Sequence, residues 1–368
     1  MKSKKILFVI QNDLLGGAEQ LLKTLATEND TNGNLVHIII MREPMKRNWD
    51  NISDTIQLQY LNTKTYFPGI LKLAWFIIWF TKKRDFDYTF SSNININAVL
   101  GLLYKFKLLK TKKLIIRETT SVFLRIKGLK KQFHILKYKL GYSSASLIIC
   151  QTDVMKNQFL DNLYSSHKWK MKTIQNPIDL KKIISNSSLP FEGFLPEKNR
   201  KYIVSAGRFI HEKGFDLLIQ SFSELNHLIP DYDLLILGEG KLRFQYEKMV
   251  EDLTLQNRVF LPGFIHNPIP YFKMANICIV SSRTEGFPNV LLQMASVNDN
   301  VISTLCSGNI DLIPCIHLCE SNNREVITKI LSKVINERLP NMEIKKKTDY
   351  LLKNNFQNYI STINFELK

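Results

Sequence analysis

One short segment of the chain combines residue types that could hold a phosphate group. Residues 207–214, Gly-Arg-Phe-Ile-His-Glu-Lys-Gly, follow an apolar run that is typical of a buried strand. Gly207 would let the chain turn where a side chain would block a ligand. Arg208 offers a planar set of N–H donors and Lys213 a mobile positive charge. A helix predicted to begin near Phe215 would add free peptide N–H groups, so the segment predicts a diphosphate site without metal. A solvated loop with two surface cations is the alternative.

Two further polar loops follow predicted strands in the second half of the chain. Gly238-Glu239-Gly240 comes after the apolar run 234–237, and Ser281–Gln293 comes after the apolar run 277–280. Each loop precedes a segment with helical spacing. The carboxyl ends of parallel strands meet at one edge of an open sheet, which is where ligands bind. The three loops are therefore expected to form one site.

The order of these motifs resembles a known enzyme family. Gly-Arg-x4-Lys-Gly, then Gly-x-Gly, then Glu-Gly-Phe-Pro-x4-Gln is similar to the nucleotide-binding half of retaining glycosyltransferases of family 4. The resemblance is good over residues 201–304 and weaker at Gly16-Gly17-Ala18-Glu19, which follows the first predicted strand. It implies an α/β fold with two Rossmann-like domains that face a cleft, the GT-B fold.

The chain is long enough for such a pair of domains, with 368 residues. A polar run over residues 185–200, with serine, proline and glycine, is typical of a linker. We therefore expect an acceptor-binding domain over 1–180 and a nucleotide-sugar-binding domain over 201–350. A C-terminal helix over 351–368 is expected to pack back on the first domain, as it does in the resembled family.

The resemblance also implies roles for single residues. Glu285 would lie beside the donor sugar and orient its hydroxyl groups, and it is predicted to act in catalysis together with Arg208 and Lys213. The two cations would offset the charge that develops on the leaving diphosphate. The predicted donor-binding set consists of Gly16, Gly17, Gly207, Arg208, Lys213, Gly238, Glu285, Gly286, Phe287, Asn289, Val290 and Gln293.

The chain departs from the family pattern at one of these positions. Family members carry a second glutamate eight residues after the first, where it binds the ribose hydroxyls, and here that position is Gln293. An amide can still accept a ribose hydroxyl proton, but it loses the stronger charge-assisted bond, worth about 1 kcal/mol. Weaker donor binding is the expectation, and an inactive protein is the alternative.

Acceptor-binding residues are predicted at the end of a strand over residues 113–116. Arg117 could pair with a phosphate of the acceptor, and Glu118 could be buried or catalytic. Many relatives place a histidine near this strand end. None stands here, so that role is not transferred.

No metal ion or other cofactor is expected. Asp85-x-Asp87 and Asp231-x-Asp233 look like metal-binding pairs, but each sits where an acidic residue often ends a helix-to-strand turn. Cys315 and Cys319, with His317 between them, lack a second nearby pair of ligands for zinc. Unpaired cysteines and the lack of a secretion signal favour the cytoplasm.

Two segments bear on a membrane. The net charge is +17, and between Tyr104 and Lys139 the chain has only one acid, Glu118, among cations at 105, 107, 110, 112, 113, 117, 125, 127, 130, 131, 137 and 139. This segment is either a solvated helical face or a membrane-facing patch. The apolar segment 71–80 is too short to span a bilayer, which takes about 20 residues. We expect a buried helix there; an interfacial helix with Trp75 and Trp79 at the lipid boundary is the alternative.

Taken together, the sequence predicts a retaining glycosyltransferase, a hexosyl- or N-acetylhexosaminyltransferase. Its donor is expected to be a nucleoside-diphosphate sugar, UDP-linked, and its acceptor a lipid-linked glycan such as an O-antigen or capsule precursor. The expected location is the cytoplasm, peripheral to the anionic inner face of the plasma membrane. A degenerate, non-catalytic nucleotide-sugar-binding protein and a GT-B nucleotide-sugar epimerase are the alternatives. Nucleic acid is not an expected partner, because no recognised binding module is present.

Overall fold

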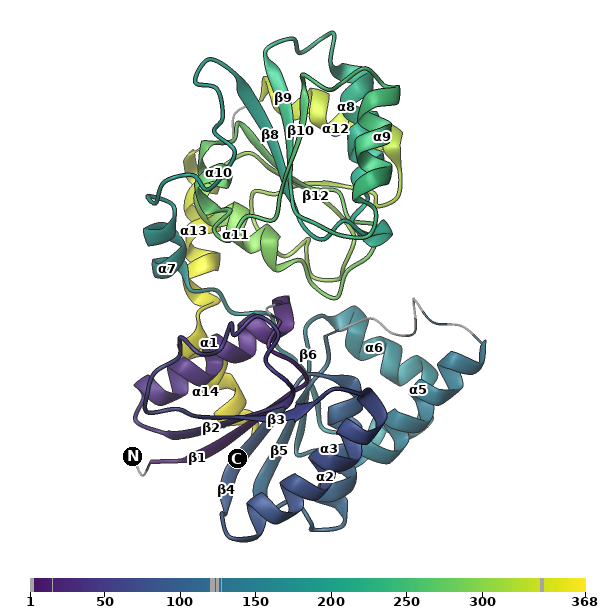
Figure 1. The fold of residues 1–368 in the computed structure, drawn as a ribbon. Coiled ribbons are helices and arrows are strands. Elements are labelled where there is room, and N and C mark those ends of the chain that lie inside the picture. Colours follow the sequence, from purple (N-terminus) through teal and green to yellow (C-terminus); the bar gives the residue numbers. More distant parts are fainter. Residues whose placement is uncertain (1–2, 15, 120–122, 124–125, 127, 338–340) are drawn as a thin grey trace. The chain divides into compact units, whose positions relative to one another are not determined.

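The chain forms two compact units, each built around one parallel sheet (Figure 1). The computed structural model describes residues 3–14, 16–119, 123, 126, 128–337 and 341–368. The first unit consists of Met1–Pro177 with Phe356–Lys368, and the second of Ile178–Asn355. The first unit thus contains the C-terminal helix of the chain. The predicted α/β class with two Rossmann-like parallel sheets is confirmed.

The first unit has a sheet of seven strands in the order β3-β2-β1-β4-β5-β6-β7, all parallel. The strands are β1 Lys5–Ile10, β2 Leu35–Arg42, β3 Gln57–Thr63, β4 Phe86–Ser91, β5 Thr111–Arg117, β6 Leu147–Cys150 and β7 Met171–Thr173. Most residues of the central strands are buried, which explains their continuous apolar runs.

Helices cover both faces of this sheet. One core packs the sheet against α1 Gly17–Thr31 and α14 Phe356–Glu366. The other core packs it against α2 Tyr66–Lys82, α3 Ile94–Lys105, α5 Gly128–Gly141 and α6 Asp153–Asn162. Short 3-10 helices, η1 Tyr142–Ser144 and η2 Tyr164–Lys168, connect the last elements. None of the described helices combines the length and apolar character that crossing a bilayer requires.

The second unit has a parallel sheet of six strands in the order β10-β9-β8-β11-β12-β13. The strands are β8 Lys201–Ala206, β9 Tyr232–Leu237, β10 Val259–Gly263, β11 Ile277–Val280, β12 Val301–Thr304 and β13 His317–Cys319. One face is covered by α8 Phe215–Leu225, α9 Arg243–Asp252 and α12 Arg324–Asn336. The other is covered by α7 Leu180–Asn186, α10 Ile269–Met274, α11 Asn289–Val297 and α13 Asn341–Lys353.

Three local predictions need correction. The helix over residues 71–80 is not buried all round: α2 turns one side to the core and exposes the other, which carries Trp75 and Trp79. The sequence predicts Asp153 as the N-cap of the helix that runs from Val154 onward, but Asp153 does not cap α6. The cap is Thr152, whose side chain accepts a hydrogen bond from the peptide N–H of Met155 at 3.2 Å. The C-terminal helical segment is interrupted at residues 354–355 and forms two helices, α13 and α14.

Candidate functional site

Two of the predicted loops flank the point where the order of the second sheet reverses. Strands β8 and β11 are neighbours at its centre, with β9 beyond β8 and β12 beyond β11. The loop after β8 holds the Gly-Arg-x4-Lys-Gly segment, and the loop after β11 holds Glu285. Open α/β sheets bind ligands at such a reversal, beyond the carboxyl ends of the strands. The topology therefore brings both motifs to the expected edge.

The side chains of Lys213 and Glu285 meet between these loops. Lys213 Nζ lies 2.7 Å from Glu285 Oε1, although the residues are 72 positions apart. The hydroxyl of Ser282 donates to the same oxygen at 2.7 Å. The Lys213 and Glu285 side chains are 16% and 15% exposed. A charged pair that is largely withdrawn from water but still open on one side can present its cation to an anionic ligand.

Backbone contacts fix the two loops to each other. Ser281 Oγ donates to the carbonyl of Lys213 at 3.0 Å, and the N–H of Arg283 donates to the carbonyl of Glu212 at 2.7 Å. Gly214 has a φ of 65°, and a Cβ there would lie 2.3 Å from the Ser281 carbonyl oxygen. Only glycine fits this position, which is both left-handed and crowded.

A second ion pair clamps the same loops, and sequence reasoning missed it. The Arg283 guanidinium makes two parallel bonds to Asp216, from Nη1 to Oδ1 at 2.7 Å and from Nη2 to Oδ2 at 2.6 Å. Asp216 lies in the first turn of α8, directly after the phosphate-type loop. Burial alone would raise the pKa of Asp216, but the hydrogen bonds and charge of Arg283 outweigh it and lower the pKa. An arginine two residues before the motif glutamate was the available signal.

Arg208 lies in the same loop as Lys213 but does not engage the Lys213–Glu285 pair. Its side chain is exposed and makes no hydrogen bond or ion pair within the described part of the chain. Gly207 lies against the Lys213 side chain, where a Cβ would sit 3.1 Å from Lys213 Cε. Gly238 is required by packing, since a Cβ there would lie 1.8 Å from the Gly207 carbonyl oxygen. The expected contact of Gly238 with the donor stays a prediction.

The other predicted donor residues continue from Glu285 into α11. The Glu285 N–H donates to the Cys306 carbonyl at 2.8 Å, and Ser307 donates to the carbonyl of Gly286. Burial, followed by the nearby Glu285 charge, raises the pKa of the Cys306 thiol to about 12, so it stays protonated at neutral pH. Phe287 is buried, and its ring packs into the core of the unit.

Helix α11 begins at Asn289, directly after Pro288. Val290 and Gln293 are both partly exposed, and Gln293 lies one turn into the helix. Gln293, where the sequence departs from the family pattern, thus lies on the helix that directly follows the loop of Glu285. The roles of these residues toward a donor stay predictions.

Gly16 and Gly17 belong to the first unit, at the start of α1 and after the central strand β1. A neighbour that sequence reasoning missed, Asp13, is fully buried there. Its Oδ2 accepts hydrogen bonds from the peptide N–H groups of residues 45, 46 and 47 at 2.9, 2.8 and 2.7 Å. Asp13 thereby ties the loop after β2 to the glycine turn. An isolated aspartate gave no signal in the sequence.

Arg117 and Glu118 lie inside the first unit rather than on its surface. The Arg117 Nη2 donates to Asn176 Oδ1 at 2.6 Å, while Glu118 Oε2 accepts from the Tyr142 hydroxyl at 3.0 Å. Burial lowers the pKa of Arg117, and the nearby Tyr359, Glu19 and Glu118 oppose that shift. Both residues are buried, at 3% exposure each. Their contact with an acceptor stays a prediction.

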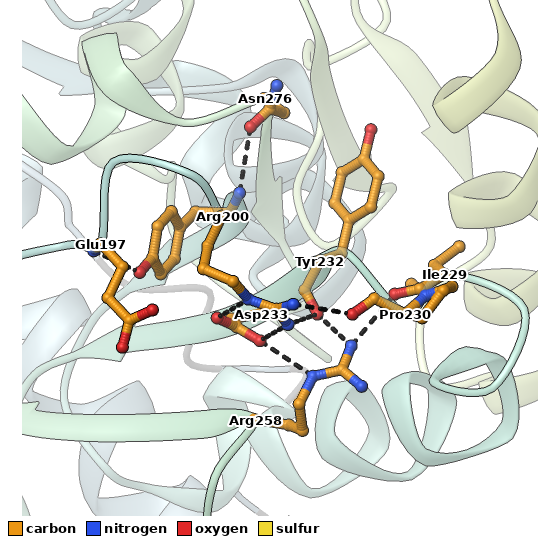
Figure 2. Close-up of polar contacts among 9 residues, drawn as sticks. Glu197, Arg200, Ile229, Pro230, Tyr232, Asp233, Arg258 and Asn276 are labelled. Atoms are coloured by element: carbon orange, nitrogen blue, oxygen red, sulfur yellow. Dashed lines mark hydrogen bonds and ion pairs between the residues drawn. The ribbon is translucent and has the colours of Figure 1, made fainter.

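One aspartate of each predicted metal-type pair, Asp233 and Asp87, is held by structural partners. Asp233 is held by two arginines, Arg200 and Arg258, with Nε–O distances of 2.9 Å each (Figure 2). It stands at the amino end of β9, the opposite end from the loop that holds Gly238. Asp87 accepts from Lys112 at 2.7 Å and from the N–H of Lys5 at 2.9 Å. Within the described ranges no three His, Cys, Asp or Glu side chains gather as a metal site would require.

Comparisons with known proteins identify the family of the second unit. Residues 190–350 match the family model described as "Glycosyl transferases group 1". The chain carries a group 1 glycosyltransferase domain. This glycosyltransferase domain spans nearly all of the second unit, and it includes every predicted donor residue except Gly16 and Gly17.

Individual relatives extend the likeness beyond that domain. An uncharacterized glycosyltransferase of Methanocaldococcus jannaschii is 33% identical over 218 residues, 58% of this chain and 53% of the relative. The matched region thus spans about half of that relative. The N-acetylgalactosamine-N,N'-diacetylbacillosaminyl-diphospho-undecaprenol 4-alpha-N-acetylgalactosaminyltransferase of Campylobacter jejuni is 28% identical over 305 residues, 78% of this chain and 77% of the relative.

A solved structure shows the same fold over the whole chain. The crystal structure of Anabaena HepE in complex with UDP and glucose is similar with a TM-score of 0.77 and 16% identity, covering 98% of this chain and 99% of that one. At this identity the likeness establishes the GT-B fold and not the ligand.

Proposed function

We propose that this protein is a retaining glycosyltransferase that transfers a sugar from a nucleoside-diphosphate donor, UDP-linked, to a lipid-linked glycan. The observation that carries the proposal is the cluster at the reversal of the second sheet. Lys213 is paired with Glu285 there, and the exposed Arg208 stands in the same loop as Lys213. The sugar proposed to be transferred is a hexosyl or an N-acetylhexosaminyl group.

The proposed chemistry divides the work between cations and carboxylate. Breaking the sugar–phosphate bond adds negative charge to the leaving diphosphate, and fixed cations placed there stabilise the transition state. Arg208 and Lys213 take that role. Glu285 accepts hydrogen bonds from the sugar hydroxyls, which orients the ring. The second oxygen of Glu285 is the natural acceptor, because Oε1 already receives Lys213 and Ser282.

The diphosphate site is proposed to work without a metal ion. Arg208 and Lys213 place two positive side chains in the loop after β8, and such side chains can bind a diphosphate through charged hydrogen bonds. Of the aspartates that resemble metal ligands, Asp87, Asp231 and Asp233 are already engaged by lysine or arginine.

The proposed acceptor is a polyprenyl-diphosphate-linked glycan of O-antigen or capsule type. Support comes from the name of the Campylobacter relative, which specifies a sugar-diphospho-undecaprenol acceptor, and from the basic first unit. Such an acceptor lies at a membrane, so the protein is proposed to work in the cytoplasm, peripheral to the inner face of the plasma membrane. Arg117 and Glu118 are the proposed acceptor-side residues.

Nucleotide binding by calorimetry tests the proposal, using UDP, GDP and ADP with and without magnesium. We expect UDP to bind equally well in both conditions. Arg208→Ala and Lys213→Ala should each weaken binding by about 10- to 100-fold, the loss of one charged hydrogen bond. Lys248→Ala, an exposed lysine on α9, is the matched control and should bind as the wild type does. Unchanged affinity in both variants would contradict the phosphate assignment, and strict dependence on magnesium would contradict the metal-free site.

Gln293 favours a second candidate, a degenerate protein that binds a nucleotide sugar without transferring it. The variant Gln293→Glu restores the family carboxylate. If the protein is an enzyme, the wild type should transfer sugar and the variant should bind the donor as tightly or more tightly. Donor binding with no transfer in the wild type, and transfer in the variant, would establish the degenerate protein. Conversion of the donor to an epimer without an acceptor would instead indicate an epimerase.

A further inference from the structure

Helix α2 exposes a stripe of large apolar side chains. Phe67, Leu71, Trp75 and Trp79 are spaced four residues apart and are between 57% and 74% exposed. The opposite side of the helix, with Leu73 and Ile77, is buried in the core of the unit. A helix on the surface of a water-soluble domain normally turns polar residues outward. Single exposed apolar residues are common, but a row of four large ones needs a reason.

Helix α5 carries a second stripe of the same kind. Leu129, Phe133, Leu136 and Leu140 follow the four-three-four spacing of one helical face and are between 41% and 82% exposed. Lysines stand beside them at 130, 131, 137 and 139. Lys130 and Lys139 are exposed and have no side-chain partner within the described ranges.

The two stripes belong to one layer of the first unit. Helices α2, α3 and α5 share the core on one face of the sheet, and α3 contacts both of the others (Figure 1). The fit between α3 and α5 is close: a Cβ on Gly101 would lie 1.7 Å from the carbonyl oxygen of Gly141. Phe106 and Leu108, which directly follow α3, are also exposed. The apolar residues therefore sit on a rigid support.

The charge of this layer has one sign. Helices α2, α3 and α5 contain no aspartate or glutamate. Helix α2 ends in the exposed Lys82 and is followed by the exposed Lys83 and Arg84. Helix α3 ends in the exposed Lys105, and the exposed Lys107 follows it. The nearest acids in sequence are Asp85 and Asp87, which follow α2, and Glu118, which lies between α3 and α5. Asp87 is paired with Lys112 and Glu118 is buried. Arg125 and Lys127, which belong to the same basic segment, lie outside the described residues.

We infer that the exposed sides of α2 and α5 form a docking surface for an anionic lipid bilayer. Tryptophan and phenylalanine would enter the interface between headgroups and acyl chains, and the flanking lysines would meet the negative headgroups. Helix α2, at 17 residues, is about 25 Å long and lies along such a surface rather than across the bilayer.

Charge selects the bilayer over a protein partner. An apolar interface with another protein needs no uniform rim of cations, and a second copy of this chain would bring equal charges together. An anionic membrane satisfies the apolar stripes and the cations at once. The inference rests on the proposed function in one respect, because a lipid-linked acceptor requires an enzyme that works at a membrane. The surface itself is argued from the first unit alone.

Vesicle flotation of the purified full-length protein tests the inference. We expect binding to phosphatidylcholine vesicles that contain phosphatidylglycerol, weak binding to phosphatidylcholine alone, and release at about 0.5 M salt, where surface charges are screened. The double variant Trp75→Gln/Trp79→Gln and the double variant Phe133→Gln/Leu136→Gln should each lower the partition coefficient by about ten-fold or more. The double variant Lys130→Gln/Lys139→Gln should remove much of the preference for phosphatidylglycerol.

The control is Phe244→Gln, which removes an equally exposed aromatic residue from α9 in the second unit and should bind vesicles as the wild type does. UDP affinity is measured on the wild type and on every variant, and the apolar-stripe variants should bind UDP normally. A wild type that binds UDP but not vesicles would overturn the docking surface and leave the donor site intact. A wild type that binds vesicles but not UDP would contradict the donor site and leave the docking surface intact. Equal binding of all variants, or lipid-free self-association that the Trp75→Gln/Trp79→Gln variant abolishes, would also overturn the inference.

Discussion

The charged pair in the second unit predicts an unusual response to one substitution. In the structure Glu285 holds the ammonium group of Lys213 at 2.7 Å, so a diphosphate that binds Lys213 must share it with a carboxylate. Replacing Glu285 with glutamine removes that negative charge and keeps the shape of the side chain. We therefore expect Glu285→Gln to bind free UDP more tightly than the wild type, although it should transfer sugar far more slowly.

The size of the effect follows from the geometry. A phosphate oxygen bound to Lys213 would lie about 3 Å from Nζ, and so at most about 6 Å from the Glu285 oxygen. Two unit charges at about 6 Å repel by about 3 kcal/mol at an effective dielectric constant of about 20. The intervening ammonium group offsets most of this. About 1 kcal/mol should remain, which corresponds to about five-fold tighter UDP binding.

Titration calorimetry with UDP and with the UDP-sugar separates the two contributions of Glu285. UDP should bind more tightly to Glu285→Gln, whereas the UDP-sugar should lose that advantage because its hydroxyls lose a charged acceptor. Glu247→Gln, which breaks a 2.7 Å pair with Arg243 on the surface of α9, is the matched control and should change neither affinity. A loss of UDP affinity of ten-fold or more in Glu285→Gln would refute the reasoning, because it would mean that the carboxylate is needed to position Lys213.

Three further substitutions test the framework around the sites by urea denaturation. Asp13→Ala should lower the free energy of unfolding by about 3 kcal/mol because three peptide N–H groups lose their acceptor, and a change below about 1 kcal/mol would contradict that role. Gly238→Ala should cost about 3 kcal/mol or more, since its Cβ would lie 1.8 Å from the Gly207 carbonyl oxygen; a neutral variant would show that the two turns can separate. Asp216→Asn breaks the pair with Arg283, whose contribution is present above the unfolded pKa of about 3.9 and is lost as pH falls through the lowered folded pKa. Asp216→Asn should therefore be less stable than the wild type at pH 7, the difference should shrink below about pH 4, and a difference that is independent of pH would argue against the ion pair.

Local spacing in the sequence was sufficient for most of the fold. Apolar runs of four to six residues followed by glycine turns or polar loops predicted β1, β8, β9 and β11, and the predicted helix start at Phe215 agrees with α8. These features depend on neighbours in the chain, because a buried parallel strand is apolar on both faces and a strand-to-helix turn needs small or polar residues. The order of three such turns was enough to indicate the glycosyltransferase family.

The sequence was less informative where the outcome depends on which side of an element faces the core. The apolar segment of α2 predicted burial, but periodicity cannot separate a buried helix from one whose second face is exposed for a partner. The predicted N-cap of α6 was wrong by one position. Threonine and aspartate both cap helices well, and the local backbone conformation decides that Thr152 rather than Asp153 is the cap.

The amino-acid sequence by itself determined the class of fold, the turn at each strand end and the residue types available for phosphate and sugar. Only the tertiary structure decided which of them meet. It placed Lys213 against Glu285 and Arg283 against Asp216, buried Arg117, and left Trp75 and Trp79 exposed on a layer without acids. The reason is physical: contacts between residues 60 or more positions apart depend on strand order and helix packing, which a motif in the sequence does not specify.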